Sequence, residues 1–508
     1  MWKKYVWIYK KKVDISDEIL IDAPYRKPLS FQEFHQNLEN IQDDFSKLSI
    51  GSNDTVALVL RNGPDLASIF IACSCFAIAA PLNPNYSKNE FIFYLSDLKA
   101  KFLIVDPEIK TEALKAAYEL DIVIIDLIPH NKAGSFVLKK NNMTKKNNID
   151  TYFESNISLL LHTSGTTSKP KLVKLSSENL IKSALNIGKT LQLNRDDCCL
   201  NIMPLFHIHG LIAVLLSSVI FNVRLICTSG FNALIFFKHL KQYKPTWYSG
   251  VPTMHQAILQ RSEKNSTIIK NSSLRFIRSS SAALPKPLYN KLEETFNCPV
   301  IEAYGMTEAS HQIASNPLPP KVRKKGTVGL KTCSSIEVID INGNILERQK
   351  EGEIIIKGET IFNGYVNNEK ANKNSFYNGW FKSGDLGLID EDGYIKITGR
   401  IKEIINKGGE KISPKEIDDV LQEIDQIEQV ICFPFSSKKY GEEIGCAIVL
   451  KNKMKISENE LIEYASKYLA KYKIPSKFVF IHEIPKGPTG KLQRIGLSKL
   501  LGLENDQH

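Results

Sequence analysis

The sequence predicts an α/β fold, with a large N-terminal domain of mostly parallel sheets flanked by helices and a small α+β C-terminal domain. Two observations support this prediction. Short apolar, β-rich runs alternate with helical patterns over the first 400 residues, which is typical of parallel sheets covered on both faces. Near residue 400 the pattern changes to two strand-like runs between two amphipathic segments. We therefore expect domains at 1–400 and 401–508.

The elements of the large domain are predicted from periodicity and from turn residues. Apolar runs of strand length predict strands at 55–60, 101–106, 121–126 and 158–164. Helical patterns lie between the strands, at 68–78 and 107–118. Prolines and asparagines predict a loop at 79–87, and the polar stretch 139–150 predicts a surface excursion.

The elements of the small domain are predicted in the same way. A strand is expected at 394–400, and we place a hinge just after it, near Lys402. The remaining helices and strands are expected at 413–422, 428–435, 446–451 and 457–472. This order of elements is consistent with a compact α+β unit.

The composition is that of a globular chain of 508 residues, 43% hydrophobic and 24% charged. A net charge of +11 would suit a nucleic-acid partner. The lysines and arginines are scattered, however, and the sequence contains neither a basic–aromatic alternation nor an RNA-binding aromatic motif. We interpret the charge as solvated surface and expect no specific nucleic-acid partner.

Cysteine usage and the termini predict a reduced, cytoplasmic chain. The nine cysteines include no CxxC pair and no Cys/His cluster with zinc spacing. No apolar run reaches ~18 residues, the length needed to cross a bilayer. The N-terminus has no signal-peptide core, and the C-terminus has no peroxisomal tripeptide. We interpret Trp2, Trp7 and Tyr9, which stand among lysines, as part of an ordinary first strand rather than a membrane contact.

A polar loop with the sequence HTSGTTSKPK, at 162–171, overlaps the end of the predicted strand 158–164. Small, hydroxylated residues and one glycine allow backbone amides to face a polyphosphate, while hydroxyls and lysines add donors and charge. The pattern GxxxxGK[ST] is absent, so a P-loop NTPase fits poorly. A polar loop without a special role is the alternative. The residues predicted to contact phosphate are Thr163, Ser164, Gly165, Thr166, Thr167, Ser168, Lys169 and Lys171.

Together with this loop, six further motifs give the chain a resemblance to the adenylate-forming superfamily of acyl-CoA synthetases, luciferases and peptide-synthetase adenylation domains. In family order they are MPLFHIHGL (203–211), RSSSAAL (278–284), EAYGMTEAS (302–310), WFKSGDLG (380–387), GRIKEIINKGGEKISP (399–414) and PKGPTGKLQR (485–494). The family usually has glycine where this chain has Ser168 and Leu172. Leu172 is expected to place a bulky side chain beside the loop, which bears on its flexibility. An inactive synthetase is therefore one alternative.

The resemblance implies a nucleotide site built from the third, fourth and fifth motifs. Glu302, Ala303 and Tyr304 would bind ATP, with the Tyr304 ring against adenine. Asp385 would accept hydrogen bonds from the ribose hydroxyls, because a carboxylate has two acceptor oxygens. The planar Arg400 guanidinium suits ribose and phosphate oxygens.

The same resemblance implies the catalytic residues. Thr307 would contact the α-phosphate, and Glu308 would be a ligand of Mg²⁺, which prefers oxygen ligands. Lys491 would contact both ATP and the reacting carboxylate, holding two anions together. His207 completes the implied catalytic set. ATP and CoA would be the substrates and Mg²⁺ the cofactor.

In the family, the small C-terminal domain is mobile and acts twice. By resemblance, it would rotate about Lys402 after adenylation and bring the motif around Gly408 and Gly409 to the site, where these glycines would let CoA approach the backbone. Relatives often have lysine at the positions of Asn406 and Gly408. Transfer of the acyl group to a carrier protein is the alternative to CoA.

The acid is indicated by a cluster of hydrogen-bonding residues. Ser279, Ser280 and Ser281 stand where relatives often have glycine or alanine, and the segments 273–288 and 306–320 resemble oxalate–CoA ligases. By that resemblance, His207, Ser281 and His311 would bind oxalate, since donors stabilise a second carboxylate. Another short or dicarboxylic acid, or a larger acid, remains an alternative.

Overall fold

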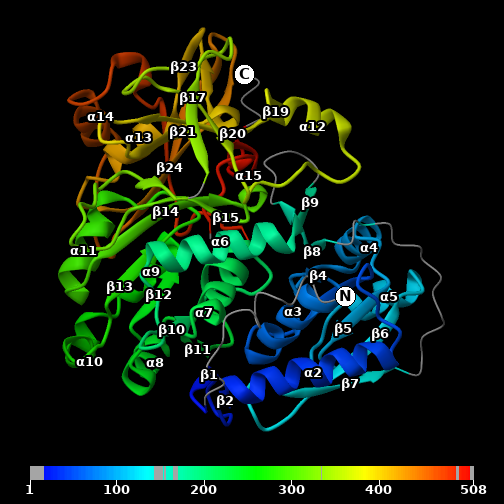
Figure 1. Ribbon diagram of the computed structural model, residues 1–508. Helices are drawn as coiled ribbons and strands as arrows, with labels where there is room; N and C mark the ends of the chain where they lie inside the picture. Colours follow the sequence, from blue (N-terminus) through cyan, green and yellow to red (C-terminus); the bar gives the residue numbers. More distant parts are fainter. Residues whose placement is uncertain are drawn as a thin grey trace.

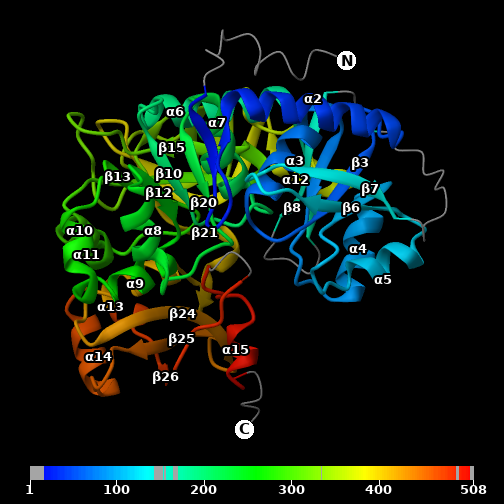
Figure 2. The ribbon, with the colours of Figure 1, turned by 90° about the horizontal axis from the view of Figure 1, so that it is seen from below.

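The computed structural model describes residues 17–141, 153, 156–163, 170–332, 334–487 and 491–503. The expected N-terminal strand around Trp2–Tyr9 and the phosphate-loop residues 164–169 lie outside the described residues. Figures 1 and 2 show two large sheets side by side, and a C-terminal unit in orange and red packed against the nine-stranded part of the body.

A nine-stranded sheet forms the larger half of the body, with the order β16-β15-β14-β13-β12-β10-β11-β1-β2. Its strands are β1 (Ile19–Asp22), β2 (Leu29–Ser30), β10 (Cys198–Asn201), β11 (Arg224–Cys227), β12 (Trp247–Gly250), β13 (Phe276–Ser279), β14 (Val300–Met306), β15 (His311–Ser315) and β16 (Leu330–Lys331). In this order, all neighbouring strands between β14 and β1 pair in parallel. Antiparallel strands form both edges, β15 and β16 at one and β2 at the other. All residues of the central strands β10, β12 and β13 are buried, as expected for parallel strands covered on both faces.

A seven-stranded sheet forms the other half, with the order β7-β6-β5-β3-β4-β8-β9. Its strands are β3 (Thr55–Val59), β4 (Ile78–Pro81), β5 (Phe102–Val105), β6 (Val123–Pro129), β7 (Phe136–Lys140), β8 (Ile157–Thr163) and β9 (Lys171–Ser176). The four strands expected in this region are all present, and the central ones pair in parallel. The predicted parallel α/β class is therefore confirmed.

Helices cover both sheets (Figure 1). They are α2 (Phe31–Lys47), α3 (Pro64–Phe76), α4 (Lys88–Asp97), α5 (Ala113–Glu119), α6 (Ser177–Thr190), the π-helix η2 (His209–Leu216), α7 (Ser217–Ile220), α8 (Phe236–Tyr243), α9 (Pro252–Leu259), η3 (Glu263–Asn265), α10 (Ser266–Lys270) and α11 (Lys286–Phe296). Ser30, Ser87 and Ser176 begin three of them with capping boxes, which satisfy otherwise unpaired backbone N–H groups. Helix α3 is apolar nearly all round, because it lies buried in the body.

A third sheet of five antiparallel strands follows, and the sequence prediction of largely parallel sheets did not anticipate it. The strands are β17 (Ser335–Ile339), β18 (Gly352–Lys357), β19 (Phe376–Tyr377), β20 (Trp380–Ile389) and β21 (Ile395–Arg400). The helix α12 (Glu369–Ser375) precedes β19, and η4 (Thr307–Ala309) lies earlier, between β14 and β15. Strand β21 confirms the strand expected at 394–400 and ends directly before the predicted hinge.

The C-terminal unit has its own sheet and its own apolar clusters. Its elements are η5 (Ile401–Glu403), β22 (Ile405–Lys407), β23 (Glu410–Ile412), α13 (Pro414–Leu421), β24 (Ile427–Ser437), β25 (Gly441–Leu450), α14 (Glu458–Ser466), η6 (Lys471–Lys473), β26 (Lys477–Phe480) and α15 (Leu497–Leu500). The predicted small α+β domain is confirmed. The domain boundary itself, 1–400 against 401–508, stays a prediction.

Several predicted boundaries are wrong. Residues 79–81 belong to strand β4 instead of a loop, because their small apolar side chains are buried between β3 and β8. Helix α3 begins four residues before the predicted 68, and α5 begins six residues after the predicted 107. Helix α14 ends at Ser466, before the predicted 472.

The cysteines also differ from the expectation of a fully reduced chain. Cys432 and Cys446 form a disulfide, with Cα atoms 4.0 Å apart. They are direct cross-strand partners in β24 and β25, a register that their separation of 14 residues does not reveal. In the part of the chain that the structure describes, no helix is long and apolar enough to cross a membrane.

Candidate active site

Tyr304, Asp385 and Arg400 form one cluster where β14 meets the third sheet. Asp385 and Arg400 are cross-strand neighbours in β20 and β21, and the Arg400 Nε donates to Asp385 Oδ1 at 2.6 Å. The Tyr304 hydroxyl donates to Asp385 Oδ2 at 2.5 Å. The carboxylate raises the pKa of the Arg400 guanidinium, and burial raises the pKa of the Tyr304 hydroxyl. The cluster joins residues of three predicted motifs, and Tyr304 and Asp385 are 81 residues apart in the sequence.

Thr307 and Glu308 lie directly after β14, in the short helix η4, and both are half-buried. Glu308 Oε1 accepts a hydrogen bond of 2.8 Å from the hydroxyl of Tyr365, a residue that sequence reasoning missed. The Lys171 ammonium lies 4.3 Å from the centre of the Tyr365 ring, an attractive cation–π contact. Desolvation, together with repulsion by Lys402, lowers the pKa of Lys171. Tyr365 thus links Glu308 to the end of the phosphate loop.

The phosphate loop connects β8 and β9. Thr163 ends β8 and Lys171 begins β9, and they are paired across the two strands. Ser164, Gly165, Thr166, Thr167, Ser168 and Lys169 lie outside the described residues. Leu172 is directed away from the position we expected, because its side chain is 2% exposed and packs into the apolar cluster behind β8. Its bulk therefore supports the base of the loop.

Glu302 and Ala303 occupy the buried middle of β14. Burial raises the pKa of the Glu302 carboxyl to about 8, opposed by a backbone hydrogen bond from Gly326 and by the charge of Lys415. Within the described part of the chain, one carboxyl oxygen of Glu302 has no hydrogen-bond partner. The Ala303 carbonyl accepts a hydrogen bond of 2.9 Å from Ser280.

Lys491 is half-buried between the cluster of Tyr304, Asp385 and Arg400 and a group of histidines. Desolvation and, second, repulsion by the Arg400 guanidinium lower its pKa to about 8, and the carboxylates of Asp385 and Glu308 oppose the shift. Lys491 in turn depresses the pKa of His207, a second effect after burial. Its ammonium therefore lies within electrostatic reach of both groups.

The loop that carries Lys491 is held on both sides. Gly487 N–H donates to the Lys491 carbonyl at 2.8 Å. Beyond Lys491, the buried Arg494 guanidinium binds Glu403 at 2.9 Å and Asp418 at 2.6 Å, and it also donates to the Cys432 carbonyl. These contacts fix the end of the lysine loop against the segment that follows the predicted hinge.

The acid-site candidates gather at the carboxyl ends of the parallel strands β10, β12, β13 and β14, the edge where open α/β sheets bind ligands. His207 and His209 follow β10, Ser281 follows β13, and His311 begins β15. His209 Nδ1 lies 2.9 Å from the Ser281 hydroxyl, and its ring contacts that of His311 edge-on at 4.9 Å between centroids. The structure thus brings His209, Ser281 and His311 together.

Several nitrogens of this histidine cluster lack protein partners. Among the described residues, His207 Nε2 and both ring nitrogens of His311 are buried without a hydrogen bond. Burial lowers the pKa of His207 to about 4 and places those of His209 and His311 well below the ordinary value, so that all three rings are neutral near pH 7. Unpaired buried polar atoms are costly, so they indicate a place for a polar ligand.

Arg278 contacts this cluster through His209 and was also missed by sequence reasoning. Its guanidinium is fully buried, and its described partners are neutral: His209 Nε2 at 3.3 Å, the Ser249 hydroxyl at 3.3 Å and Gln312 Oε1 at 3.2 Å. Burial lowers its pKa to about 9, which leaves it cationic at pH 7. An arginine directly after the apolar pair Phe276–Ile277, within a stretch of strand length, was the signal that could have revealed it.

The three serines do not act alike. Ser281 contacts His209, and Ser280 donates to a backbone carbonyl. The buried Ser279 hydroxyl has no hydrogen-bond partner among the residues that the structure describes. The backbone is strained at the same place, because Ser281, Ser310 and His311 have φ of 74°, 52° and 93°. Left-handed backbone at residues other than glycine is uncommon and concentrates at functional sites.

The predicted CoA residues lie apart from these clusters. Gly408 and Gly409 form the two-residue turn between β22 and β23, with φ of 59° and 95°, as such tight hairpins require. A Cβ at 408 would meet Tyr440 and one at 409 would meet nothing within 4 Å. Lys402, the predicted hinge, is exposed in η5.

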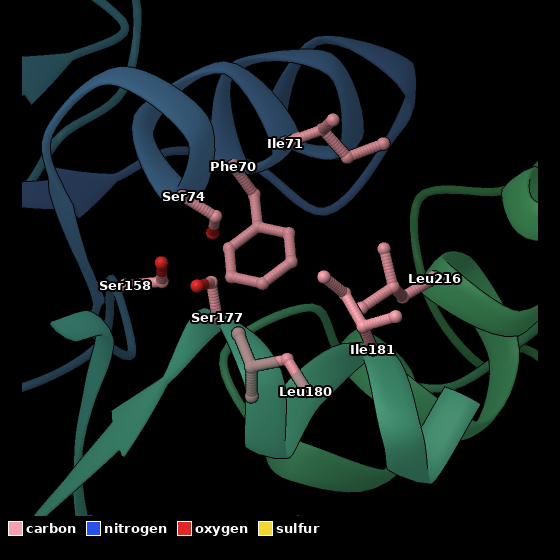
Figure 3. A pocket seen from close by; sticks show the side chains of 8 residues that line it. All are labelled: Phe70, Ile71, Ser74, Ser158, Ser177, Leu180, Ile181 and Leu216. Carbon is pink, nitrogen blue, oxygen red and sulfur yellow. The ribbon is translucent and has the colours of Figure 1, made fainter. Parts of the chain in front are cut away.

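A separate small pocket lies between α3, β8, α6 and η2 (Figure 3). Phe70, Ile71 and Leu180 line it, together with the hydroxyls of Ser74 and Ser158. None of the predicted site residues is among its lining residues. The pocket is therefore distinct from the histidine cluster.

Two family models match the chain. The AMP-binding enzyme model matches residues 13–366, and the model of the AMP-binding enzyme C-terminal domain matches residues 416–491. The first match covers more than half of the chain, so the chain belongs to the AMP-binding enzyme family.

Relatives with the same extent support this assignment. A probable CoA ligase of Humulus lupulus is 41% identical over 477 residues, covering 91% of this chain and 90% of that protein. An oxalate–CoA ligase of Saccharomyces cerevisiae is 40% identical over 468 residues, covering 87% and 86%. The structure of o-succinylbenzoate CoA synthetase from Bacillus subtilis with its acyl-adenylate is 28% identical, with a TM-score of 0.80 over 97% of each chain. The protein is an AMP-forming acid–CoA ligase.

Proposed function

We propose that this ligase activates oxalate with ATP and transfers the oxalyl group to CoA. The observation that carries the proposal is the group of polar side chains around His209, which binds Ser281 and contacts the His311 ring. Among the described residues, His207 Nε2 and both ring nitrogens of His311 have no hydrogen-bond partner. Such donors suit a small acid with a second carboxylate, whereas a long or aromatic acid needs apolar walls. The 40% identity to an oxalate–CoA ligase supports this choice.

The nucleotide would bind along the Tyr304–Asp385–Arg400 cluster. The Asp385 carboxylate would exchange its present partners for the ribose hydroxyls, and Tyr304 would offer its ring to adenine. The phosphates would lie against Lys171, Thr307 and the loop between β8 and β9. The predicted contacts of Glu302 and Ala303 stay a proposal as well.

Mg²⁺ would accompany ATP at Glu308. The described residues contain no group of three or more His, Cys, Asp or Glu that could hold a metal by itself. A single carboxylate fits a cation that takes its other ligands from phosphates and water. The Tyr365 hydroxyl fixes one oxygen of Glu308, which leaves the other available. When bound, the cation would offset phosphate charge.

In the first half-reaction, an oxalate oxygen would attack the α-phosphorus, the bond from that phosphorus to the bridging oxygen would break, and pyrophosphate would leave. Lys491 would stabilise this step, because two anions that approach each other repel strongly without a cation. Its position between Arg400, Asp385 and the histidines suits that role.

In the second half-reaction, the CoA sulfur would attack the acyl carbon and AMP would leave. We propose that the C-terminal domain, 401–508, rotates about Lys402 for this step and brings Gly408 and Gly409 to the adenylate. The observed position of Lys491 beside the site and the exposed glycine turn fit the state before that rotation.

Pyrophosphate release across a panel of acids tests the proposed substrate. Oxalate is expected to give the highest kcat/KM among oxalate, malonate, acetate, octanoate and 4-coumarate. Malonate is the second candidate, because the buried cationic Arg278 would suit any short diacid. Turnover of octanoate without turnover of oxalate would remove the polar-pocket proposal and leave the ligase class intact.

The first prediction concerns the acid-binding side chains. His311→Ala and Ser281→Ala should each reduce kcat/KM for oxalate by about ten- to a hundredfold, because losing a hydrogen bond to a charged group costs about 1.5–3 kcal/mol. The KM for ATP should stay constant, since neither residue contacts the nucleotide cluster. Weaker binding of ATP, to the same extent as the loss in kcat/KM for oxalate, would contradict the assignment. Steady-state kinetics with each substrate varied in turn measures this.

A further inference from the structure

A buried chain of four side chains ends at the acid site. From Arg278 Nη1 it runs 3.3 Å to the Ser249 hydroxyl, then 2.7 Å from that hydroxyl to His209 Nε2, and then 2.9 Å from His209 Nδ1 to the Ser281 hydroxyl. Arg278, Ser249 and His209 are each at most 2% exposed. The mechanism described above uses only the last member, Ser281.

The chemistry of these groups fixes the direction of the chain. A guanidinium can only donate, so Arg278 gives a hydrogen to Ser249, and it also lies 3.3 Å from His209 Nε2. If Nε2 carried a hydrogen, that N–H would face an Arg278 N–H at 3.3 Å, and Ser249 would have to turn its own hydrogen to the Arg278 carbonyl, 3.5 Å away. The neutral ring is therefore expected to hold its hydrogen on Nδ1 and to accept at Nε2.

The tautomer of His209 decides what Ser281 can offer. With the hydrogen on Nδ1, the ring donates to the Ser281 oxygen, and the hydroxyl hydrogen of Ser281 stays available. With the hydrogen on Nε2, Nδ1 would instead accept the Ser281 hydrogen, and the serine would face a ligand with its lone pairs. An anion needs the first arrangement.

We propose that Arg278 is a positioning residue for the acid: through Ser249 and His209 it holds the Ser281 hydroxyl as a donor toward the distal carboxylate of a short diacid. This inference rests on the proposed function. Arg278 itself would not contact the substrate, because His209 lies between Arg278 and Ser281. Since its partners among the described residues are neutral, the Arg278 charge has no carboxylate partner in that part of the chain, and the bound diacid would supply a negative charge nearby.

The first test compares two arginines near the same strand. Arg278→Met removes the donor and the charge at the start of the chain. Arg275→Met is the matched control, because Arg275 pairs with Asp197 outside the acid site. We expect kcat/KM for oxalate to fall about ten- to a hundredfold in Arg278→Met, with acetate within about threefold of wild type. Arg275→Met should keep the wild-type ratio of oxalate to acetate. Equal losses for both acids in Arg278→Met overturn the proposal.

The second test changes the direction of the chain at its centre. The amide nitrogen of His209→Asn takes roughly the place of Nδ1 and can still donate to Ser281, whereas that of His209→Gln takes roughly the place of Nε2. We expect His209→Asn to keep kcat/KM for oxalate within about tenfold of wild type and His209→Gln to lose as much as Arg278→Met. The reverse order overturns the proposal. Thermal unfolding of each variant identifies losses that come from stability.

A third measurement does not depend on the substrate. Histidine ring ¹⁵N NMR of the full chain, with His209→Asn used to assign the signal, should show a hydrogen on Nδ1 of His209, and Arg278→Met should change that signal. A hydrogen on Nε2 in the wild type overturns the proposal. If wild-type protein turns over no diacid, the proposed function fails, and the NMR result still decides whether the chain has the stated direction.

Discussion

At the scale of single residues, Lys491 lies within electrostatic reach of Arg400, which repels its ammonium, and of the carboxylates of Asp385 and Glu308, which attract it. On its other side are neutral histidines, His207 among them. An ammonium placed there can contact an incoming acid and a nucleotide together. Two predictions follow from this position.

Lys491→Ala should reduce adenylate formation by about two to three orders of magnitude, because loss of one anion-stabilising group costs about 3–4 kcal/mol. Thioester formation from supplied acyl-adenylate should fall much less, since no repulsion between two anions arises in that step. Pyrophosphate exchange and CoA consumption measure the two half-reactions separately. Equal losses in both would contradict a role confined to adenylation.

The lowered pKa of Lys491 predicts a pH dependence. Below pH 8 the group is a cation, and it loses its proton as the pH rises through about 8. The kcat/KM for the acid should therefore fall tenfold per pH unit above about pH 8. Bound ATP should raise the pH at which this fall begins, because the negative phosphates favour the ammonium form of Lys491. A flat profile between pH 7 and 10 would show that the charge of Lys491 is not required.

At the scale of elements, the connection between β14 and β15 shapes the acid site. Gly305 and His311 face each other there so closely that a Cβ on Gly305 would lie 1.7 Å from the His311 carbonyl oxygen. The left-handed backbone of Ser310 and His311 turns the chain back within a few residues. This close approach is what brings the His311 ring beside His209.

Gly305→Ala should therefore push the two strands apart and displace His311. Overpacking of this kind costs about 1–3 kcal/mol of unfolding free energy, and we expect the loss of acid activation to exceed the loss of ATP binding. Gly51→Ala is the control, because its added Cβ would meet Asp54 only at ordinary contact distance, 3.4 Å. Chemical denaturation and pyrophosphate release measure the two effects. Wild-type stability in Gly305→Ala would contradict the prediction.

At the scale of the whole molecule, side-chain amides join the C-terminal unit to the body. Gln256 donates to the Glu428 carbonyl at 3.0 Å, Gln260 donates to the Glu428 carboxylate at 2.7 Å, and Gln429 donates to Gln256 at 2.7 Å. Such polar contacts between domains are few and can be exchanged with water, so they permit relative motion. The predicted hinge at Lys402 lies at the start of the chain segment that would move.

Lys402→Pro should keep the C-terminal unit in the observed position, because proline fixes φ near −65° and restricts the preceding residue. Pyrophosphate exchange should then persist while overall CoA turnover falls at least about tenfold, because the second half-reaction needs the rotation. Lys402→Ala, which removes the charge but leaves the backbone free, should retain both activities. Unchanged CoA turnover in Lys402→Pro would place the hinge elsewhere.

The class of this protein could be predicted from the sequence, because its motifs are local and keep their order whatever the packing. Alternating strands and helices predicted the parallel sheets, and Lys491 was identifiable from the motif PTGK. The antiparallel third sheet was not predicted, because most of its strands follow one another without a helix between them and so lack the alternation that predicted the other sheets.

Side-chain direction was decided only by the tertiary structure, because it depends on strand register and on pairing between distant segments. Register turned Leu172 into the core, paired Cys432 with Cys446, and directed Ser281 toward His209 while Ser280 binds the backbone. The same long-range packing placed Arg278 beneath His209, 69 residues away, and only burial of both makes that contact a candidate determinant of substrate choice.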